Sequence, residues 1–366
     1  MTGGPPTVLM TADAVGGVWS YALGLCAALS DIRFVLATLG PRPRAAQRAA
    51  VAPLKNVVLA ESDFSLEWMA GGQADVGASR RWLEALAGRH GVDLVHVNGY
   101  AQACLDGPRP TIVVAHSDVL SWWMAVRREP APPEWRDYSR QVVRGLRAAD
   151  RVVAPTRAVQ HDLQRQYGLT LCNASVIPNG VDVGAFAPRR KQPVITASGR
   201  VWDAAKNLRL LDDIAPELPW PIEIAGDVTH PGNGVARLRF VRPLGVLGPT
   251  EMRDHLTEAA IFAAPALYEP FGLGILEAAA AGCPLVLGDI PSLRENWDGA
   301  AIFLPPDDRS QWRSALARLI GDQEERERLA AAARARAERF TLARTAGRYR
   351  ALYRALTAGA AERRVA

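Results

Sequence analysis

Short apolar segments alternate with segments of helical periodicity along most of the chain, and this alternation constrains the fold more than any other feature. In the first half, apolar runs occupy residues 7–12, 33–39, 92–98, 111–117 and 150–156. A buried strand followed each time by an amphipathic helix is typical of βαβ units with a parallel sheet. We therefore predict a doubly wound α/β domain in the first half.

The same rhythm restarts after an irregular stretch. Apolar runs return at 193–201, 221–227, 238–245, 259–266, 284–290 and 300–306, and the chain closes in helices rich in alanine and arginine. The stretch 176–193 between the halves contains Asn179-Gly180 and several prolines, which mark a turn and a linker. The pattern predicts a second α/β domain and a boundary near Pro178, with one large doubly wound sheet as the alternative.

Composition narrows the class of protein. The chain has 366 residues, of which 49% are hydrophobic and 22% are charged. Its net charge is +5, and almost all of its basic residues are arginines. That length suits two domains, and an arginine-rich composition requires no nucleic-acid partner. The four cysteines show no metal or disulfide spacing. No signal peptide or membrane span is apparent, so we expect a cytoplasmic protein.

The glycine pair Gly16-Gly17 follows the first apolar run and opens the next helical segment. Glycines at this place leave backbone N–H groups bare beside the positive end of a helix, where an anion or a sugar could approach. The pair is neither a dinucleotide fingerprint nor a P-loop. A simple tight turn is the alternative.

Two basic residues follow the first strand of the second half. Arg200 lies at the end of that strand, and Lys206 lies near the start of the next helix. A guanidinium offers a planar fork and an ammonium a mobile point charge, so the pair suits a diphosphate without a metal. A solvated surface is the alternative.

Two glutamates flank a Pro-Phe-Gly corner in the stretch 268–288. The helix that starts at Gly272 has N–H groups that can take a phosphate. Glu269, ahead of it, can reach a hydroxylated group, and Glu277, in its second turn, can accept bonds from a vicinal diol such as a ribose. A capping acid plus a surface acid is the alternative.

In combination these motifs resemble a known family. Glu-Pro-Phe-Gly-Leu with glutamates eight apart, Gly-Arg-x5-Lys, Pro-Asn-Gly-Val-Asp and the Gly-Gly turn are similar to the retaining glycosyltransferases of family 4, over about Val8 to Tyr353. The resemblance implies the GT-B fold: two Rossmann-like domains facing a central cleft. Residues 1–178 would bind the acceptor and residues 179–340 the nucleotide-sugar donor, with a helix in 341–366 crossing back to the first domain.

The resemblance also implies roles for individual residues. It assigns the diphosphate to Arg200 and Lys206, the ribose to Glu277 and the hydroxyls of the transferred sugar to Glu269. The remaining donor-site residues would act mainly through their backbone or apolar groups, and they are Gly16, Gly17, Leu244, Gly245, Phe271, Gly272 and Leu273.

His116 ends a strand at its carboxyl edge, which in an open α/β sheet faces the ligand. The resemblance places it near the reaction centre, where it could donate a hydrogen bond to a sugar hydroxyl or stabilise developing charge, and it joins Glu269, Arg200 and Lys206 as a catalytic candidate. A structural histidine is the alternative. We expect the acceptor to contact Trp19, His96, Asn98 and Trp122.

The predicted chemistry is a metal-independent transfer with retention, from a UDP- or GDP-sugar to a glycan, lipid-linked or small-molecule acceptor. No clear pair of nucleophile and separate acid/base is present, which favours a front-face route in which the leaving diphosphate takes the acceptor's proton. The chain contains no Asp-x-Asp, so we expect no metal and no other cofactor. The competing functions are a nucleotide-sugar epimerase or hydrolase and a non-catalytic binding module.

A row of arginines suggests a further partner. They lie three or four residues apart on one face of a predicted helix, opposite apolar side chains, and they are Arg136, Arg140, Arg144, Arg147 and Arg151. Such a face could rest on anionic lipid at the inner face of the membrane. A solvated helix face is the alternative.

Overall fold

The computed structural model describes residues 6–69, 71–230 and 234–365, which fold into two compact units. Unit 1 comprises Met1–Met124, Glu129–Pro178 and Leu342–Ala366, and unit 2 comprises Ala125–Arg128 and Asn179–Thr341. The last helix therefore belongs to the first unit. None of the helices in the described parts of the chain combines the length and apolar character that a bilayer crossing requires.

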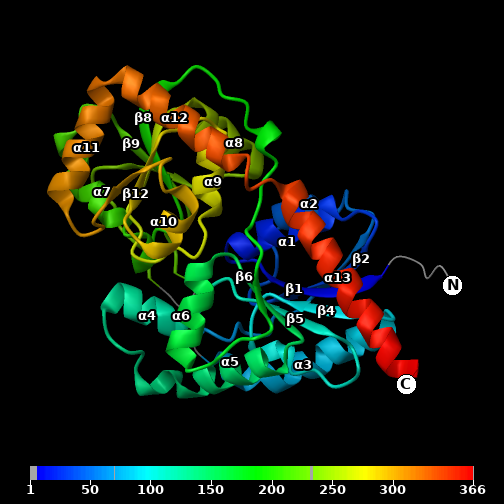
Figure 1. Ribbon diagram of the computed structural model, residues 1–366. Coiled ribbons are helices and arrows are strands. Elements are labelled where there is room, and N and C mark those ends of the chain that lie inside the picture. Colours follow the sequence, from blue (N-terminus) through cyan, green and yellow to red (C-terminus); the bar gives the residue numbers. More distant parts are fainter. Residues whose placement is uncertain (1–5, 70, 231–233, 366) are drawn as a thin grey trace. The chain divides into compact units, whose positions relative to one another are not determined.

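Unit 1 is built on a seven-stranded parallel sheet in the order β3-β2-β1-β4-β5-β6-β7 (Figure 1). Its strands are β1 Thr7–Asp13, β2 Arg33–Leu39, β3 Val57–Glu61, β4 Leu94–Val97, β5 Thr111–Val114, β6 Arg151–Ala154 and β7 Ala174–Val176. Because all pairings are parallel, the carboxyl ends of these strands meet at one edge of the sheet.

Helices cover both faces of this sheet. They are α1 Gly17–Ala28, α2 Ala45–Val51, α3 Gly72–Arg89, α4 Val119–Arg127, α5 Arg136–Ala148, α6 Arg157–Tyr167 and α13 Leu342–Val365, with short 3-10 turns at Ala101–Ala103 and Pro133–Trp135. Val95 and Val97 join the core formed with α3, α5 and α6. His96, between them, contacts Tyr21 of α1 and Tyr353 of α13, as the alternation of side chains along a strand requires.

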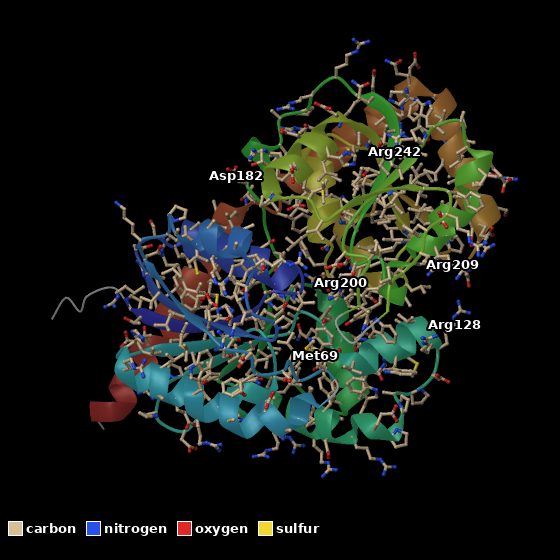
Figure 2. The ribbon with its side chains drawn as sticks, turned by 180° about the vertical axis from the view of Figure 1, so that it is seen from behind. Met69, Arg128, Asp182, Arg200, Arg209 and Arg242 are labelled. Atoms are coloured by element: carbon tan, nitrogen blue, oxygen red, sulfur yellow. The ribbon has the colours of Figure 1, made fainter. Side chains whose placement is uncertain are left out.

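Unit 2 repeats this design with a six-stranded parallel sheet in the order β10-β9-β8-β11-β12-β13. Its strands are β8 Gln192–Ser198, β9 Ile222–Ala225, β10 Arg242–Gly245, β11 Ala259–Ala264, β12 Leu285–Gly288 and β13 Ile302–Leu304. The carboxyl ends again share one edge. Figure 2 shows Arg200, which follows β8, at the carboxyl edge of this sheet and Arg242, which begins β10, towards its amino edge.

The helices of unit 2 form two cores, one on each face of the sheet. Buried residues of α7 Leu208–Ile214 and α11 Arg309–Gly321 fill one core. The other core contains α8 Pro249–Glu258, α9 Leu273–Ala280, α10 Pro291–Trp297 and part of α12 Gln323–Ala337. The remaining short turns are Val183–Ala185, Ala204–Lys206 and Ala215–Glu217.

Each unit is thus a parallel sheet with helices on both faces, and the predicted α/β class with two doubly wound sheets is confirmed. The alternative of one large sheet is wrong, because the described strands form two separate sheets, one in each half of the chain.

Candidate functional site

At the carboxyl edge of unit 2, the loops that leave β8, β9 and β10 pack backbone against backbone. Gly226 has φ of +154°, and a Cβ added there would lie 1.7 Å from the carbonyl oxygen of Gly199. The Gly226 N–H donates to the carbonyl of Gly245 over 2.8 Å. Only glycine permits this approach, which carries the Arg200 loop next to the end of β10.

Lys206 and Glu269 form an ion pair in this region. Lys206 Nζ donates to Glu269 Oε2 over 2.5 Å, and their side chains are 18% and 17% exposed. The Lys206 turn is also tied to the segment before Glu269, since the Leu267 N–H donates to the carbonyl of Ala205 over 2.8 Å. Two predicted site residues that are 63 positions apart are thus in direct contact.

Arg200 is held by two neighbours that sequence reasoning missed. Arg200 Nη2 donates to Asp203 Oδ2 over 2.6 Å, and the guanidinium lies 5.2 Å from the ring centre of Trp202. Asp203 Oδ1 also accepts from the Ala205 N–H over 3.0 Å and so caps the turn that ends at Lys206. The only available signal was the position of both residues between Arg200 and Lys206.

Trp202 has a neighbour of its own on the next loop of the sheet edge. Its ring meets His230, after β9, edge to face with centroids 4.6 Å apart. The loop after β9 therefore supports the Arg200 loop through an aromatic contact. Such T-shaped pairs are a favoured geometry for aromatic rings.

The amino terminus of α9 reaches this region without a side-chain cap. Its N-cap is Gly272, with φ of +86°, and a Cβ at Gly274 would lie 2.6 Å from Ser198 Oγ. Glycine at 274 therefore lets the end of β8 approach the first helical turn, which starts at Leu273. First-turn N–H groups without a cap, at the positive end of a helix, suit an anion.

Phe271, just before α9, contributes to this region through its backbone alone. Its side chain is buried in the core and packs edge to face against Phe340, with ring centroids 5.7 Å apart. Leu244 and Gly245 are the last two residues of β10, and Gly245 has φ of +70°. They too offer mainly backbone groups at this edge.

Glu277 lies in the second turn of α9. Its carboxylate makes no hydrogen bond or ion pair with any described residue, and burial raises its pKa to about 7. A largely buried carboxylate without a partner is unfavourable. Hydroxyl donors of a ligand would relieve that cost.

The carboxyl edge of unit 1 begins with the glycine pair. Gly16 is extended and is the N-cap of α1, which starts at Gly17 without a side-chain cap. Trp19, predicted to contact an acceptor, is 6% exposed and packs in the core. The turn thus exposes backbone N–H groups, whereas the Trp19 side chain serves packing.

Three polar side chains near the ends of β4 and β5, those of His96, Asn98 and His116, are bonded to one another. His96 is fully buried, and burial lowers its pKa to about 3. Burial likewise lowers the pKa of His116 to about 4, although part of its surface reaches solvent. Asn98 lies between them, 3.2 Å from His96 Nε2 and 2.9 Å from His116 Nε2. A neutral His116 supplies no full positive charge near neutral pH.

Trp122 and the arginine row lie elsewhere in unit 1. Trp122, on α4, is half-buried and meets Trp123 edge to face. Four arginines of the row, from Arg136 to Arg147, are exposed on α5, and Arg140 pairs with Asp137 over 2.7 Å. Acceptor contact through Trp122 and lipid contact through α5 stay predictions.

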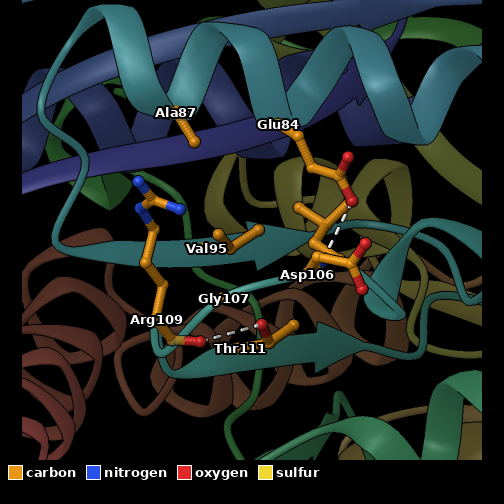
Figure 3. A pocket seen from close by; sticks show the side chains of 8 residues that line it. Glu84, Ala87, Val95, Asp106, Gly107, Arg109 and Thr111 are labelled. Carbon is orange, nitrogen blue, oxygen red and sulfur yellow. Dashed lines mark hydrogen bonds between the residues drawn. The ribbon is translucent and has the colours of Figure 1, made fainter.

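A small pocket at the opposite, amino edge of the unit 1 sheet carries no comparable chemistry (Figure 3). Two of its lining groups are already bonded, since Glu84 Oε1 accepts from the Asp106 N–H over 2.9 Å. The other lining residues are Ala87, Val95, Leu105, Gly107, Arg109 and Thr111. Among the described residues, no cluster of three or more His, Cys, Asp or Glu side chains is arranged to hold a metal ion.

Two glycosyltransferase family models match most of the chain. The model of Glycosyltransferase Family 4 matches residues 15–185, and that of Glycosyl transferases group 1 matches residues 192–322. A D-inositol 3-phosphate glycosyltransferase of Kineococcus radiotolerans is 28% identical over 261 residues, which cover 60% of each chain. The match therefore spans about 60% of that relative's length.

Solved structures share the fold. Sucrose-phosphate synthase from Thermosynechococcus elongatus matches with a TM-score of 0.78 and 17% identity, over 97% of this chain and 100% of the other. Anabaena HepE in complex with UDP and glucose matches with a TM-score of 0.74 and 16% identity, over 96% and 100%. The predicted resemblance is confirmed, and the chain belongs to family 4 of the glycosyltransferases, the glycosyl transferases of group 1, with the GT-B fold.

Proposed function

We propose that the protein is a glycosyltransferase that moves a sugar from a nucleotide-diphospho-sugar to a hydroxyl group of an acceptor. The observation that carries the proposal is the convergence in unit 2 of two cations, an uncapped helix end and a carboxylate without a partner. The UDP and glucose held by a protein of the same fold support a donor of this class. The acceptor is a glycan, a lipid-linked intermediate or a small molecule.

In this proposal the diphosphate binds to Arg200, Lys206 and the first turn of α9. Charge-assisted hydrogen bonds to phosphate are about twice as strong as neutral ones, and the helix end adds partial positive charge. Glu277 accepts from the two ribose hydroxyls, which gives its carboxylate the partners it lacks. Leu244 and Gly245 contact the base through backbone and apolar groups.

Glu269 positions the transferred sugar rather than attacking it. Its ion pair with Lys206 supports this role, because a carboxylate already bound to an ammonium is a weak nucleophile. The reaction then follows a front-face route with retention. The bond from the anomeric carbon to the diphosphate breaks, the acceptor oxygen bonds to the same face, and the departing diphosphate takes the acceptor's proton.

The proposed transfer requires no metal ion. In many phosphoryl- and glycosyl-transfer sites a divalent cation balances the charge that develops on the leaving phosphate. Here Arg200 and Lys206, each of which is paired with a carboxylate, and the end of α9 offer N–H donors to the leaving phosphate. Activity in EDTA tests this point directly.

Titration with UDP, GDP and ADP in EDTA, by calorimetry and thermal shift, tests the donor site. A nucleotide at 100 times its dissociation constant should add about 2.7 kcal/mol of apparent stability. The matching nucleotide sugars, offered with candidate acceptors, should then give a glycosylated product together with free nucleotide. Binding to none of the three nucleotides overturns the proposal.

The same assay separates the competing functions. Release of nucleotide that no acceptor accelerates, with no glycosylated product, would indicate an epimerase or a hydrolase. Binding of nucleotide sugar without any turnover would indicate a binding module.

A further inference from the structure

The hydrogen bonds at the carboxyl edge of unit 1 determine which way the Asn98 amide points. Asn98 Nδ2 lies 2.6 Å from the backbone carbonyl oxygen of Thr11. A carbonyl oxygen only accepts, so the amide nitrogen must face it and the amide oxygen must face the other way. The Asn98 N–H also donates to Thr11 Oγ1 over 2.9 Å, which holds the residue in place.

This orientation determines the hydrogen positions on both histidines. Asn98 Oδ1 lies 2.9 Å from His116 Nε2 and 3.2 Å from His96 Nε2. An amide oxygen also only accepts, so both Nε2 atoms must carry a hydrogen. In a neutral imidazole the Nδ1 atom is then a bare acceptor.

The bonding of His96 agrees with that assignment. Its Nδ1 lies 2.6 Å from the Tyr353 hydroxyl on α13, and its Nε2 also lies 3.4 Å from the Tyr21 hydroxyl, whose oxygen can accept from an Nε2–H. The hydroxyl can donate to a bare nitrogen, and burial keeps His96 neutral by lowering its pKa to about 3. Thus Tyr353, His96, Asn98 and Thr11 form one consistent network across α13, β4 and β1.

His116 completes the network but leaves one atom unused. Its Nε2 is bonded to Asn98, and its Nδ1 makes no hydrogen bond with any described residue. Tyr21 packs edge-on against the ring, with centroids 4.7 Å apart, and restricts its rotation. The ring therefore has one bonded nitrogen and one nitrogen available to a ligand.

We propose that Asn98 and Tyr353 are positioning residues that hold His116 in its Nε2–H form, so that His116 offers a ligand a hydrogen-bond acceptor at Nδ1. Resting on the proposed function, the ligand group is a sugar hydroxyl, which must donate to His116. This differs from the expectation that His116 donates the bond. A ligand carbonyl or phosphate oxygen at the same place meets a lone pair and is disfavoured.

Nitrogen NMR of the imidazole side chains tests the assignment on the full chain without any ligand. The chain has six histidines, so single His→Gln variants assign each ring in long-range proton–nitrogen spectra. Near neutral pH we expect His116 to show a protonated Nε2 and a bare Nδ1. His161, which is exposed on α6, serves as the reference for averaged tautomers. A protonated Nδ1 or an averaged signal at His116 overturns the proposal.

Two variants separate positioning from general structural support. Asn98→Ala removes the shared acceptor, so the His116 signals should move towards those of His161. Tyr353→Phe removes only the distal donor, so the His116 signals should change less than the His96 signals. If Asn98→Ala does not fold, the wild-type spectrum still decides.

The proposal and the proposed function fail separately. The ligand-free spectrum supports or overturns the tautomer whatever the protein binds. With a nucleotide sugar that binds, the His116 Nδ1 signal should shift as expected for an accepted hydrogen bond, and the free nucleotide should not cause that shift. Absence of the shift with a bound nucleotide sugar overturns the ligand role of His116 alone.

Discussion

The carboxyl edges of the two sheets have the same backbone design but differ in how their polar side chains are bonded. In unit 2 the edge carries the ion pairs of Arg200 and Lys206, an uncapped helix end and the Glu277 carboxylate, which has no partner among the described residues. In unit 1 the side chains near the end of β4 are neutral and bonded to one another, through His96, Asn98 and Tyr353, whereas the neighbouring β1 ends in the acidic Asp13. The edge of unit 2 suits the binding of a dianionic group, and the edge of unit 1 offers side chains that can orient hydroxyls.

The two edges also differ in what holds them together. In unit 2 the contacts join loops that follow neighbouring strands. Arg200 and Lys206 lie on one of these loops, so their spacing can be recognised in the sequence. Unit 1 joins β4 to the last helix across 257 positions, from His96 to Tyr353. The following four experiments test this contrast.

Loss of Lys206 should have the largest effect. Lys206→Ala removes a cation from the proposed diphosphate site and should weaken nucleotide binding by about 1.5 to 3 kcal/mol, the range for hydrogen bonds to charged groups. Calorimetric titration with the nucleotide that binds best measures this loss. Arg209→Ala, on an exposed part of α7, removes the same charge from unit 2 and should leave the affinity nearly unchanged. An unaltered affinity in Lys206→Ala would remove Lys206 from the site.

Loss of the Tyr353 hydroxyl should have the next largest effect, and it acts on unit 1. Tyr353→Phe leaves the buried His96 Nδ1 without a donor, at a cost of about 1 to 3 kcal/mol. Amide hydrogen exchange in α13 should therefore accelerate by about 5- to 150-fold where local opening limits it.

Tyr349 supplies the matched control on the same helix. Its hydroxyl is buried and makes no well-formed hydrogen bond with a described residue, although it lies close enough to the Tyr21 hydroxyl for the two groups to shift each other's pKa. Because no well-formed bond is lost, Tyr349→Phe should accelerate the exchange of α13 less than Tyr353→Phe does. Equal acceleration in the two variants would contradict the network.

The pH dependence of donor affinity should report Glu277. Burial raises its pKa to about 7, so the free protein holds it partly protonated near neutral pH. Ribose hydroxyls donate to the ionised form, so nucleotide affinity should fall as the pH drops below 7, by at most about tenfold per pH unit. Titrations between pH 5.5 and 8.5, roughly the range that brackets this pKa, measure the slope.

Glu277→Gln provides the control for that slope. The nucleotide's own terminal phosphate also takes up a proton, with a pKa of about 6 by analogy with phosphate monoesters. Only the part of the pH dependence that disappears in Glu277→Gln belongs to the carboxylate. Superimposable profiles for the two proteins would exclude Glu277 from binding.

The smallest effect is expected for Trp202. Trp202→Ala removes the ring beside Arg200, and a cation–π contact at a partly exposed site contributes about 0.5 to 1 kcal/mol. Nucleotide affinity should fall about two- to fivefold. Trp220→Ala removes a similar contact, 5.0 Å from Arg326, and should not change the affinity. If both variants weaken binding equally, Trp202 has no specific role in holding Arg200 for the nucleotide.

The sequence by itself determined the architecture and the charged candidate residues of unit 2. Apolar runs of strand length separated by helical periods are a local signal, and they predicted two parallel sheets correctly. Glu269, Glu277, Arg200 and Lys206 were identified as candidates from spacing and from the resemblance. The contact between Lys206 and Glu269 agrees with that grouping, although their roles in binding stay predictions.

Only the tertiary structure decided the bonding around His96 and Asn98 in unit 1. Nothing near His96 in the sequence indicates that Tyr353 donates to it, because that contact exists only after α13 packs on unit 1. The same holds for Trp19, whose side chain is buried against the core. It also holds for the tautomer of His116, which depends on the direction of one amide. A local pattern predicts which residue types can do chemistry, whereas hydrogen-bond direction and burial depend on partners brought together by the fold.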